Sequence, residues 1–260
     1  MKKISLVTAY YNRRKLFHNT LKTIEKNKNK DLLEIIVVDD ASNEDNRIDD
    51  FPDIFDLDIN VIRIDPKDKT WVNPSVPFNI GFKKVSTDVV IIQNPECLHF
   101  GDIIKTSLDN VKENIYVNFG TYSIDKTKLD QINKLDFDKP SIFNNIGRLI
   151  NPMVNRGIYA DGTTAWYNHS KYRPHMLHFC SAILKKDLDE LGGFDERYAQ
   201  GIGFDDNDFL LRIKRKGMEI KMIDRPFAIH QFHGNTNYNE KVHLYNKNAI
   251  IYKESLKNNK

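Results

Sequence analysis

Short runs of aliphatic residues constrain the fold of this chain more than any other feature. Such runs lie at positions 4–7, 33–38, 61–64 and 89–92. Their length and composition predict strands buried on both faces, as in a parallel sheet. Apolar residues at helical spacing over 13–27, and a short helix expected over 77–84, place helices between these strands. The alternation predicts an α/β fold in which a mainly parallel central sheet is flanked by helices.

The second half of the chain alternates less regularly. We expect strands over 116–123, 177–184 and 218–223, and helices over 127–135, 185–191, 206–217 and 240–260. Residues 144–174 lack strong periodicity, which predicts a long loop of the kind that often serves as a lid or binding segment. The last helix is amphipathic and basic, so it is either a solvated helix or a peripheral contact with an anionic membrane.

Composition excludes several classes of protein. The formal net charge of +3 is too balanced to indicate nucleic-acid binding. The presence of only 2 cysteines excludes a secreted disulfide scaffold. The start, MKKISLV, is followed by polar residues that end the apolar run too early for a signal peptide. No apolar run approaches the ~20 residues of a membrane span, so we expect a soluble, cytoplasmic protein that does not bind nucleic acid.

Polar residues follow three of the predicted strands. They are residues 8–13, from Thr8 to Arg13, after the first, Asp39 and Asp40 after the second, and Asn94 and Glu96 after the fourth. Ligands bind beyond the carboxyl ends of strands in such sheets. The two aspartates either cap a turn or accept hydrogen bonds from the imide of uracil or the hydroxyls of a ribose. Similarly, the segment from Asn94 to Glu96 is either an ordinary Asn-Pro turn or a cation site with Glu96 as direct ligand.

Residues 192–209, GGFDERYAQGIGFDDNDF, concentrate acidic side chains between glycines. One interpretation is a helix cap with a calcium-like loop, but the spacing does not match the twelve-residue calcium-binding pattern. The other interpretation is a general base. A carboxylate at a glycine-flanked helix start suits that role, because the backbone there can approach a substrate closely.

Two further groups of residues have both a structural and a functional interpretation. His230 and His233 occur in HQFH, where a histidine is either a core side chain or a metal ligand. Residues three apart on a strand point to opposite faces, so we expect one ligand, His230. The aromatic residues of 166–173 either pack the long loop or bind the acceptor, because aromatic rings cover the apolar faces of sugars. The candidates for acceptor binding are Trp166, His169, Tyr172 and Arg173.

Taken in order, these segments resemble the glycosyltransferases of the GT-A fold, and family 2 in particular. The resemblance is carried by SLVTAYYNRRKLFHNTLKTI, EIIVVDDAS, PFNIGF, VVIIQNPE, GGFDERYAQGIGFDDNDFLLRI and AIHQFH. The last two are similar to the carboxyl-terminal motif of β-1,4-galactosyltransferases, where a Gly-rich acidic segment precedes a metal-binding histidine. The resemblance implies one GT-A catalytic domain over 1–240, with a nucleotide-sugar half (1–110) and an acceptor and catalytic half (111–240). A basic helical tail (241–260) follows.

The resemblance also implies an activity and the residues that perform it. The protein would be an inverting hexosyltransferase that moves a sugar from a nucleotide-sugar, expected to be a UDP-sugar, to a hydroxyl of a glycan or glycoconjugate. Asp206 would be the general base, and Asp205 the neighbouring carboxylate that holds the acceptor. Glu96 and His230 would bind the metal, where a mixed oxygen and imidazole shell favours Mn²⁺ over Mg²⁺. The donor site would contain Thr8, Tyr10, Arg13, Asp39, Asp40, Asn79 and Asn94.

One departure from the family pattern keeps alternatives open. Asn94 and Glu96 fall where the family usually has Asp-X-Asp, so the site has one carboxylate fewer. The metal would then bind more weakly, or only with the nucleotide, or not be needed. A nucleotidyltransferase is a second possibility, although the Gly-rich loop and lysine that those enzymes carry after the first strand are missing. A nucleotide-sugar-binding module without turnover is a third, and the Asp205-Asp206 pair argues against it.

Overall fold

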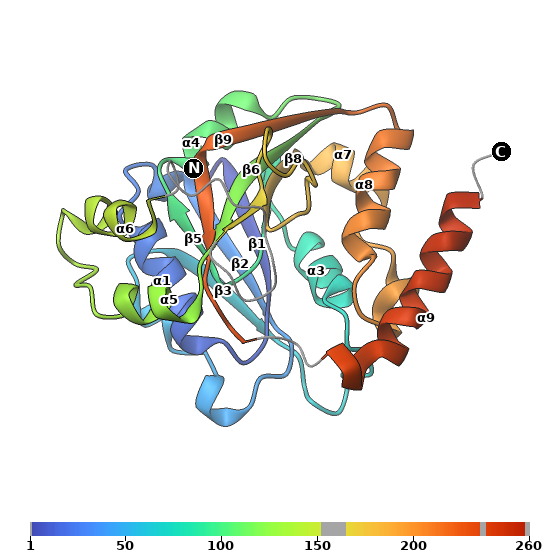
Figure 1. Ribbon diagram of the computed structural model, residues 1–260, viewed down its shortest axis with the longest axis horizontal. Coiled ribbons are helices and arrows are strands. Elements are labelled where there is room, and N and C mark those ends of the chain that lie inside the picture. The colour runs from blue at the N-terminus through green and yellow to red at the C-terminus, as the bar shows by residue number, and fades with distance from the viewer. Residues whose placement is uncertain (1, 152–164, 235–237, 258–260) are drawn as a thin grey trace.

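The computed structural model describes residues 2–151, 165–234 and 238–257. In these residues a single nine-stranded sheet runs in the order β3-β2-β1-β4-β8-β6-β9-β5, with β7 added beside β6 (Figure 1). The strands are β1 (Ile4–Tyr10), β2 (Leu33–Asp39), β3 (Asp58–Arg63), β4 (Val89–Gln93), β5 (Cys97–Phe100), β6 (Ile115–Ser123), β7 (Ala165–Asn168), β8 (Cys180–Leu184) and β9 (Glu219–His230). The predicted α/β fold is confirmed.

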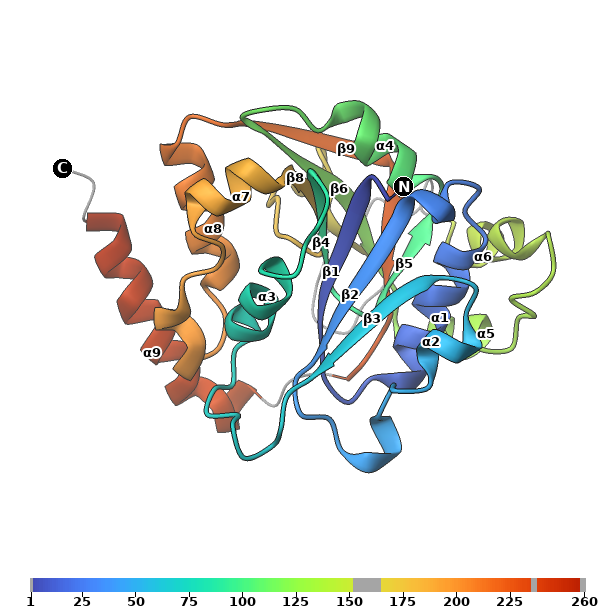
Figure 2. The ribbon, with the colours of Figure 1, turned by 180° about the vertical axis from the view of Figure 1, so that it is seen from behind.

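Helices cover both faces of this sheet, as Figures 1 and 2 show from opposite sides. Helices α1, α2 and α4 pack on one face, and α3, α7 and α8 on the other, while α5 and α6 cover the end that contains β5, β6 and β9. The helices are α1 (Arg14–Glu25), α2 (Phe51–Ile54), α3 (Ser75–Phe82), α4 (Ile103–Asn110), α5 (Lys126–Ile132), α6 (Ile142–Ile150), α7 (Lys185–Leu191), α8 (Asp205–Arg215) and α9 (Tyr238–Lys257). No helix among the described residues is long and apolar enough to cross a membrane.

The amino-terminal strands form the parallel part of the sheet. β1 pairs in parallel with β2 on one side and with β4 on the other, and β2 pairs in parallel with β3. Strands β1, β2 and β4 are buried almost throughout, as expected for aliphatic runs enclosed between helix layers. β8 joins β4 in antiparallel orientation, and the sheet is mixed from there on. The carboxyl ends of β1, β2 and β4 therefore meet at one edge.

The structure corrects the expected loop over 144–174. Helix α6 extends to Ile150 and buries Ile142, Ile146 and Ile150, which recur every fourth residue. Strand β7 pairs with β6 in antiparallel orientation and adds a further edge to the sheet. The loop prediction was wrong for both elements, because asparagines interrupt the apolar spacing of α6 and β7 is short. The remainder of that prediction, 152–164, lies outside the described residues.

The carboxyl-terminal helix α9 is also more than a solvated tail. It packs against the turn η3 (Glu196–Gln200) and against α8 (Figure 1). Asn248 is fully buried, and its side-chain amide donates hydrogen bonds to the main-chain carbonyls of Tyr198 (3.1 Å) and Gly203 (2.8 Å). A side chain at Gly201 would collide with Asn248. Helix α9 therefore fastens the glycine-rich acidic segment in place.

We predict that Gly81→Ala destabilises the protein. Gly81 lies in α3 over the centre of the sheet, where an added Cβ would sit 2.5 Å from Cγ1 of Val7 and 3.2 Å from Cγ2 of Val38. Overpacking of this kind costs about 1–3 kcal/mol, against a gain in helix propensity of about 1 kcal/mol. Urea unfolding should show a net loss of stability, while Lys83→Ala at the exposed end of the helix should be nearly neutral. A stabilised Gly81→Ala variant would contradict close packing of α3 on β1.

Candidate active site

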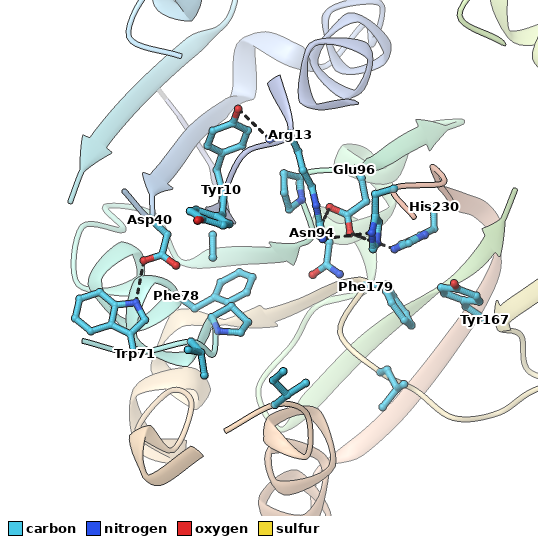
Figure 3. A pocket seen from close by; sticks show the side chains of 18 of the residues that line it. Tyr10, Arg13, Asp40, Trp71, Phe78, Asn94, Glu96, Tyr167, Phe179 and His230 are labelled. Atoms are coloured by element: carbon cyan, nitrogen blue, oxygen red, sulfur yellow. Dashed lines mark hydrogen bonds and ion pairs between the residues drawn. The ribbon is translucent and has the colours of Figure 1, made fainter. Parts of the chain in front are cut away.

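A cavity of about 810 Å³ opens where β1, β2 and β4 end. Its walls come from segments far apart in the chain: the turn after β1, the loop after β3, the β4–β5 turn, the segment before β8 and the end of β9. Figure 3 shows Asp40 and Trp71 at one end of this cavity and Glu96 and His230 at the other, with Phe78 and Asn94 between them. The cavity therefore lies at the carboxyl ends of the parallel strands, where the fold predicts a binding site.

Not all polar residues at the strand ends reach this cavity. Thr8 is fully buried inside β1, and Asp39 is held by Nη1 of Arg63 at 2.6 Å and by the backbone N–H of Ser42 at 2.9 Å. Neither belongs to the described residues that line the cavity. Tyr10 does line it, but its hydroxyl donates to the carbonyl of Asn46 at 2.6 Å. The donor-binding roles of these three side chains stay predictions.

Asp40 lies at the far end of the cavity and has two partners that the sequence analysis missed. Trp71 donates its indole N–H to Oδ1 of Asp40 at 2.8 Å, and Nζ of Lys69 lies 2.8 Å from Oδ2. Nζ of Lys69 also lies 3.9 Å from the ring centre of the half-exposed Tyr11. Burial raises the pKa of Asp40, and the Lys69 and Trp71 hydrogen bonds oppose that rise. This end combines an aromatic surface with a carboxylate and an ammonium group.

Glu96 carries the charge at the other end of the cavity and is only 1% exposed. Nη1 of Arg13 lies 2.6 Å from Oε2, and Nε2 of His230 and Nε2 of His233 lie 3.1 and 3.6 Å from Oε1. Burial alone would raise the pKa of Glu96, but the charge of Arg13 and the hydrogen bond of His230 hold it well below its usual value. Burial lowers the pKa of His233 to about 4, so this imidazole is neutral at pH 7.

The expected placement of the two histidines on opposite faces of one strand was wrong. Strand β9 ends at His230, and the chain then leaves the sheet, so His233 approaches the same carboxylate oxygen as His230. One ligand atom from each of Glu96, His230 and His233 lies within 4.8 Å of the others. Nδ1 of His230 is buried and has no hydrogen-bond partner among the described residues. One carboxylate and two imidazoles at this spacing fit a divalent transition metal such as Mn²⁺.

The acidic segment places Asp205 and Asp206 at the start of α8, after Phe204 in a left-handed conformation. Asp205 is buried and accepts a hydrogen bond from Asn73 at 3.0 Å, and burial raises its pKa. Asp206 is partly exposed and is paired with Nδ1 of His178, a residue that the sequence analysis did not select. Burial lowers the pKa of His178 to about 3, so a neutral imidazole supports this carboxylate.

These two aspartates stand beside the cavity rather than in its wall. Two lining residues connect them to the cavity: Ile202 lies shortly before α8, and Leu177 is next to His178, the partner of Asp206. Phe78, which also lines the cavity, makes an edge contact with His178 at a ring distance of 5.4 Å. The catalytic roles of Asp205 and Asp206 therefore remain predictions that this placement permits.

Asn79 lies away from the cavity and has a structural partner. Its side chain accepts from the backbone N–H of Phe194 at 2.9 Å and donates to the carbonyl of the same residue at 2.8 Å. It also donates to Oε1 of Glu196 at 2.9 Å. These bonds connect α3 to the start of the acidic segment. A direct contact of Asn79 with the donor is still a prediction.

The predicted acceptor-binding residues do not form one platform. Trp166 is buried against Tyr122 and Phe227 in the core. His169 lies between Trp166, which it meets edge to face at a ring distance of 4.5 Å, and Tyr172, whose tilted ring is 4.3 Å away. Among the four predicted residues, Arg173 alone lines the described cavity, next to Tyr167. Acceptor binding by the other three is a prediction without a cavity contact in this structure.

Solved structures with similar folds identify the fold of this chain. S. aureus TarS is 14% identical with a TM-score of 0.61, over 95% of this chain and 39% of that chain. S. aureus TarS 1–349 in complex with UDP-GlcNAc is 14% identical with a TM-score of 0.60, over 91% and 60%. The mannosyltransferase PcManGT from Pyrobaculum calidifontis, in complex with GDP-Man and Mn²⁺, is 15% identical with a TM-score of 0.56, over 95% and 64%. The chain thus spans less than two thirds of each.

These likenesses show a shared GT-A fold, and sequence comparison adds the family. A search of the curated proteins gave no match. Residues 164–234 match the profile described as the N-terminal domain of galactosyltransferase, which covers the acidic segment and the histidines. Residues 5–191, more than half of the chain, match the profile of Glycosyl transferase family 2. The resemblance that the sequence motifs suggested is confirmed, and the chain belongs to glycosyl transferase family 2.

Proposed function

We propose that the protein is an inverting glycosyltransferase that moves a sugar from a UDP-sugar to a hydroxyl of a glycan or glycoconjugate acceptor. The observation that carries this proposal is the layout of the cavity. An aromatic and carboxylate end around Trp71 and Asp40 lies opposite an end that holds the candidate metal ligands around Glu96. A nucleoside diphosphate has the same polarity, with a planar base at one end and a doubly charged diphosphate at the other.

The base end of the cavity suits a nucleobase. Tyr11 and Trp71 offer aromatic surface, on which bases stack. Asp40 and Lys69 offer an acceptor and a donor for the edge of the base or for the ribose. The TarS and PcManGT complexes contain UDP-GlcNAc and GDP-Man, which supports a nucleotide-sugar as donor.

The other end of the cavity suits the diphosphate and its cation. Glu96 and His230 would hold a Mn²⁺ ion, and His233 is placed to be a further ligand. A divalent cation bound there would stabilise the negative charge that develops on the leaving diphosphate. The Mn²⁺ in the PcManGT complex supports a metal of this kind.

The reaction itself requires a base beside the sugar. In the proposal, the acceptor hydroxyl attacks the anomeric carbon while the bond to the diphosphate breaks, and a carboxylate oxygen of Asp206 takes the proton. A single displacement of this kind inverts the anomeric configuration. The neutral imidazole of His178 keeps Asp206 oriented without adding a charge, and Asp205 is available to hold the acceptor. Arg173 and Tyr167 line the cavity and are available to contact the acceptor.

The test of the proposal is a donor screen. We expect slow hydrolysis of at least one UDP-sugar among a panel of UDP- and GDP-sugars, detected by release of the nucleoside diphosphate. Heat-inactivated protein is the control. Preference for a GDP-sugar would change the assigned base, and binding of nucleotide-sugars without any release would instead indicate a module without turnover.

For the base, we predict that Asp206→Asn lowers kcat by about 10²–10⁴-fold, since an amide cannot accept the proton. Calorimetry should show that UDP affinity is preserved. Asp189→Asn, which changes an exposed carboxylate paired with Lys185 on α7, is the matched control and should leave kcat unchanged. Near-normal turnover of Asp206→Asn would assign the proton transfer to Asp205 or to another group.

For the metal, we predict that Mn²⁺ tightens UDP binding and that Glu96→Gln removes this effect. The substitution keeps the size of the side chain but replaces the anionic ligand with a neutral amide. Calorimetric titration of UDP with and without Mn²⁺ measures the difference for both proteins. An equal enhancement in the variant would show that the cation binds elsewhere.

A further inference from the structure

We infer that Arg13 competes with the metal for Glu96. A divalent cation then binds well only after the side chain of Arg13 has left Glu96 to bind the diphosphate of the nucleotide. The inference deepens the proposed function and rests on it, because it concerns the same cation site. It assigns to Arg13 a positioning role that couples the two ligands. It also predicts that the loss of the Arg13 guanidinium strengthens the binding of the divalent metal ion.

The geometry around Glu96 carries this inference. Arg13 occupies Oε2 at 2.6 Å, and His230 and His233 approach Oε1 at 3.1 and 3.6 Å. Nη2 of Arg13 also lies 3.5 Å from Nδ1 of His233. The guanidinium thus contacts two of the three candidate metal ligands. A divalent cation held by the same three side chains would lie within a few ångströms of the positive charge of Arg13.

The carboxylates that line the cavity do not supply enough negative charge to balance both the Arg13 guanidinium and a divalent ion. Of the described carboxylates that line it, Asp40 is paired with Lys69, and Glu96 is paired with Arg13. Asn94, which lines the cavity near Glu96, is neutral (Figure 3). One buried carboxylate therefore faces a guanidinium already, and a divalent ion would add two more positive charges. At these separations, like charges repel strongly in a partly buried site.

A nucleoside diphosphate removes this conflict. Its oxygens supply the missing negative charge and are good bidentate partners for a guanidinium. Arg13 is able to change partners, because its side chain is 32% exposed while its backbone N–H is anchored to the Tyr10 hydroxyl at 3.2 Å. The backbone stays fixed and the side chain turns from Glu96 to the diphosphate. Glu96 is then free for the metal, and the two ligands bind with positive, reciprocal coupling.

A purely structural ion pair would behave differently. If Arg13 only neutralised a buried carboxylate, its removal would weaken the whole site, including its metal affinity. If Arg13 competes with the metal, its removal leaves the buried carboxylate of Glu96 uncompensated, and a metal ion then binds to it more tightly. The sign of the change in metal affinity therefore separates the two roles.

The experiment titrates Mn²⁺ into the protein without nucleotide and measures free Mn²⁺ by electron paramagnetic resonance. We expect Arg13→Gln to bind Mn²⁺ about tenfold more tightly than the native chain, or more. Arg14→Gln is the matched control: it removes the adjacent arginine, which pairs with Asp50 away from the cavity, and should change nothing. Arg13→Lys retains the charge and should keep Mn²⁺ binding weak.

The same titration is repeated with saturating UDP. UDP should tighten Mn²⁺ binding at least about tenfold in the native chain and clearly less in Arg13→Gln. Unchanged or weaker Mn²⁺ binding by Arg13→Gln without nucleotide would overturn the inference. So would native protein that binds Mn²⁺ equally with and without UDP, a comparison that needs no variant. Because neither titration involves turnover, failure of the donor screen and failure of this inference are told apart.

Discussion

The position of β1 between β2 and β4 determines most of what this chain can do. Both neighbours run parallel to β1, so three buried strands deliver their next residues to the same edge of the sheet. Tyr10 is in register with Asp39, and the β4–β5 turn brings Glu96 to the same edge. Helices close both faces, and this edge is where polar side chains can gather around a ligand.

The site that results is organised by the charge of one enclosed carboxylate. A buried carboxylate must be compensated, and Glu96 receives its partners from the two ends of the sequence, Arg13 and the residues after β9. A buried pair of this kind contributes little stability compared with apolar packing of the same volume. In the proposed function the pair has a role in ligand binding, since the partners that neutralise Glu96 in the free protein are also those that a diphosphate and a cation would engage.

Much of the fold was predictable because burial on two faces leaves a visible mark, continuous aliphatic runs such as those in β2 and β4. The site was only partly predictable. The adjacent aspartates have different surroundings. Asp39 still belongs to the strand and pairs with Arg63, whereas Asp40 lies beyond the strand and lines the cavity. His233 depends on where β9 ends, and His178 and Trp71 are single residues whose partners lie far away in sequence. No local pattern encodes such contacts.

The hydrogen bonds between Asn248 of α9 and the acidic segment have a consequence for how the sequence of such a protein can change. Asn248 holds main-chain carbonyls, so its grip does not depend on which side chains the segment carries, provided that position 201 stays glycine. Substitutions around the segment can change the cavity wall near Ile202 while the start of α8 keeps its place. In the proposed reaction, such changes would alter the surroundings of the acceptor and leave Asp206 in place, because α9 holds the main chain that precedes it.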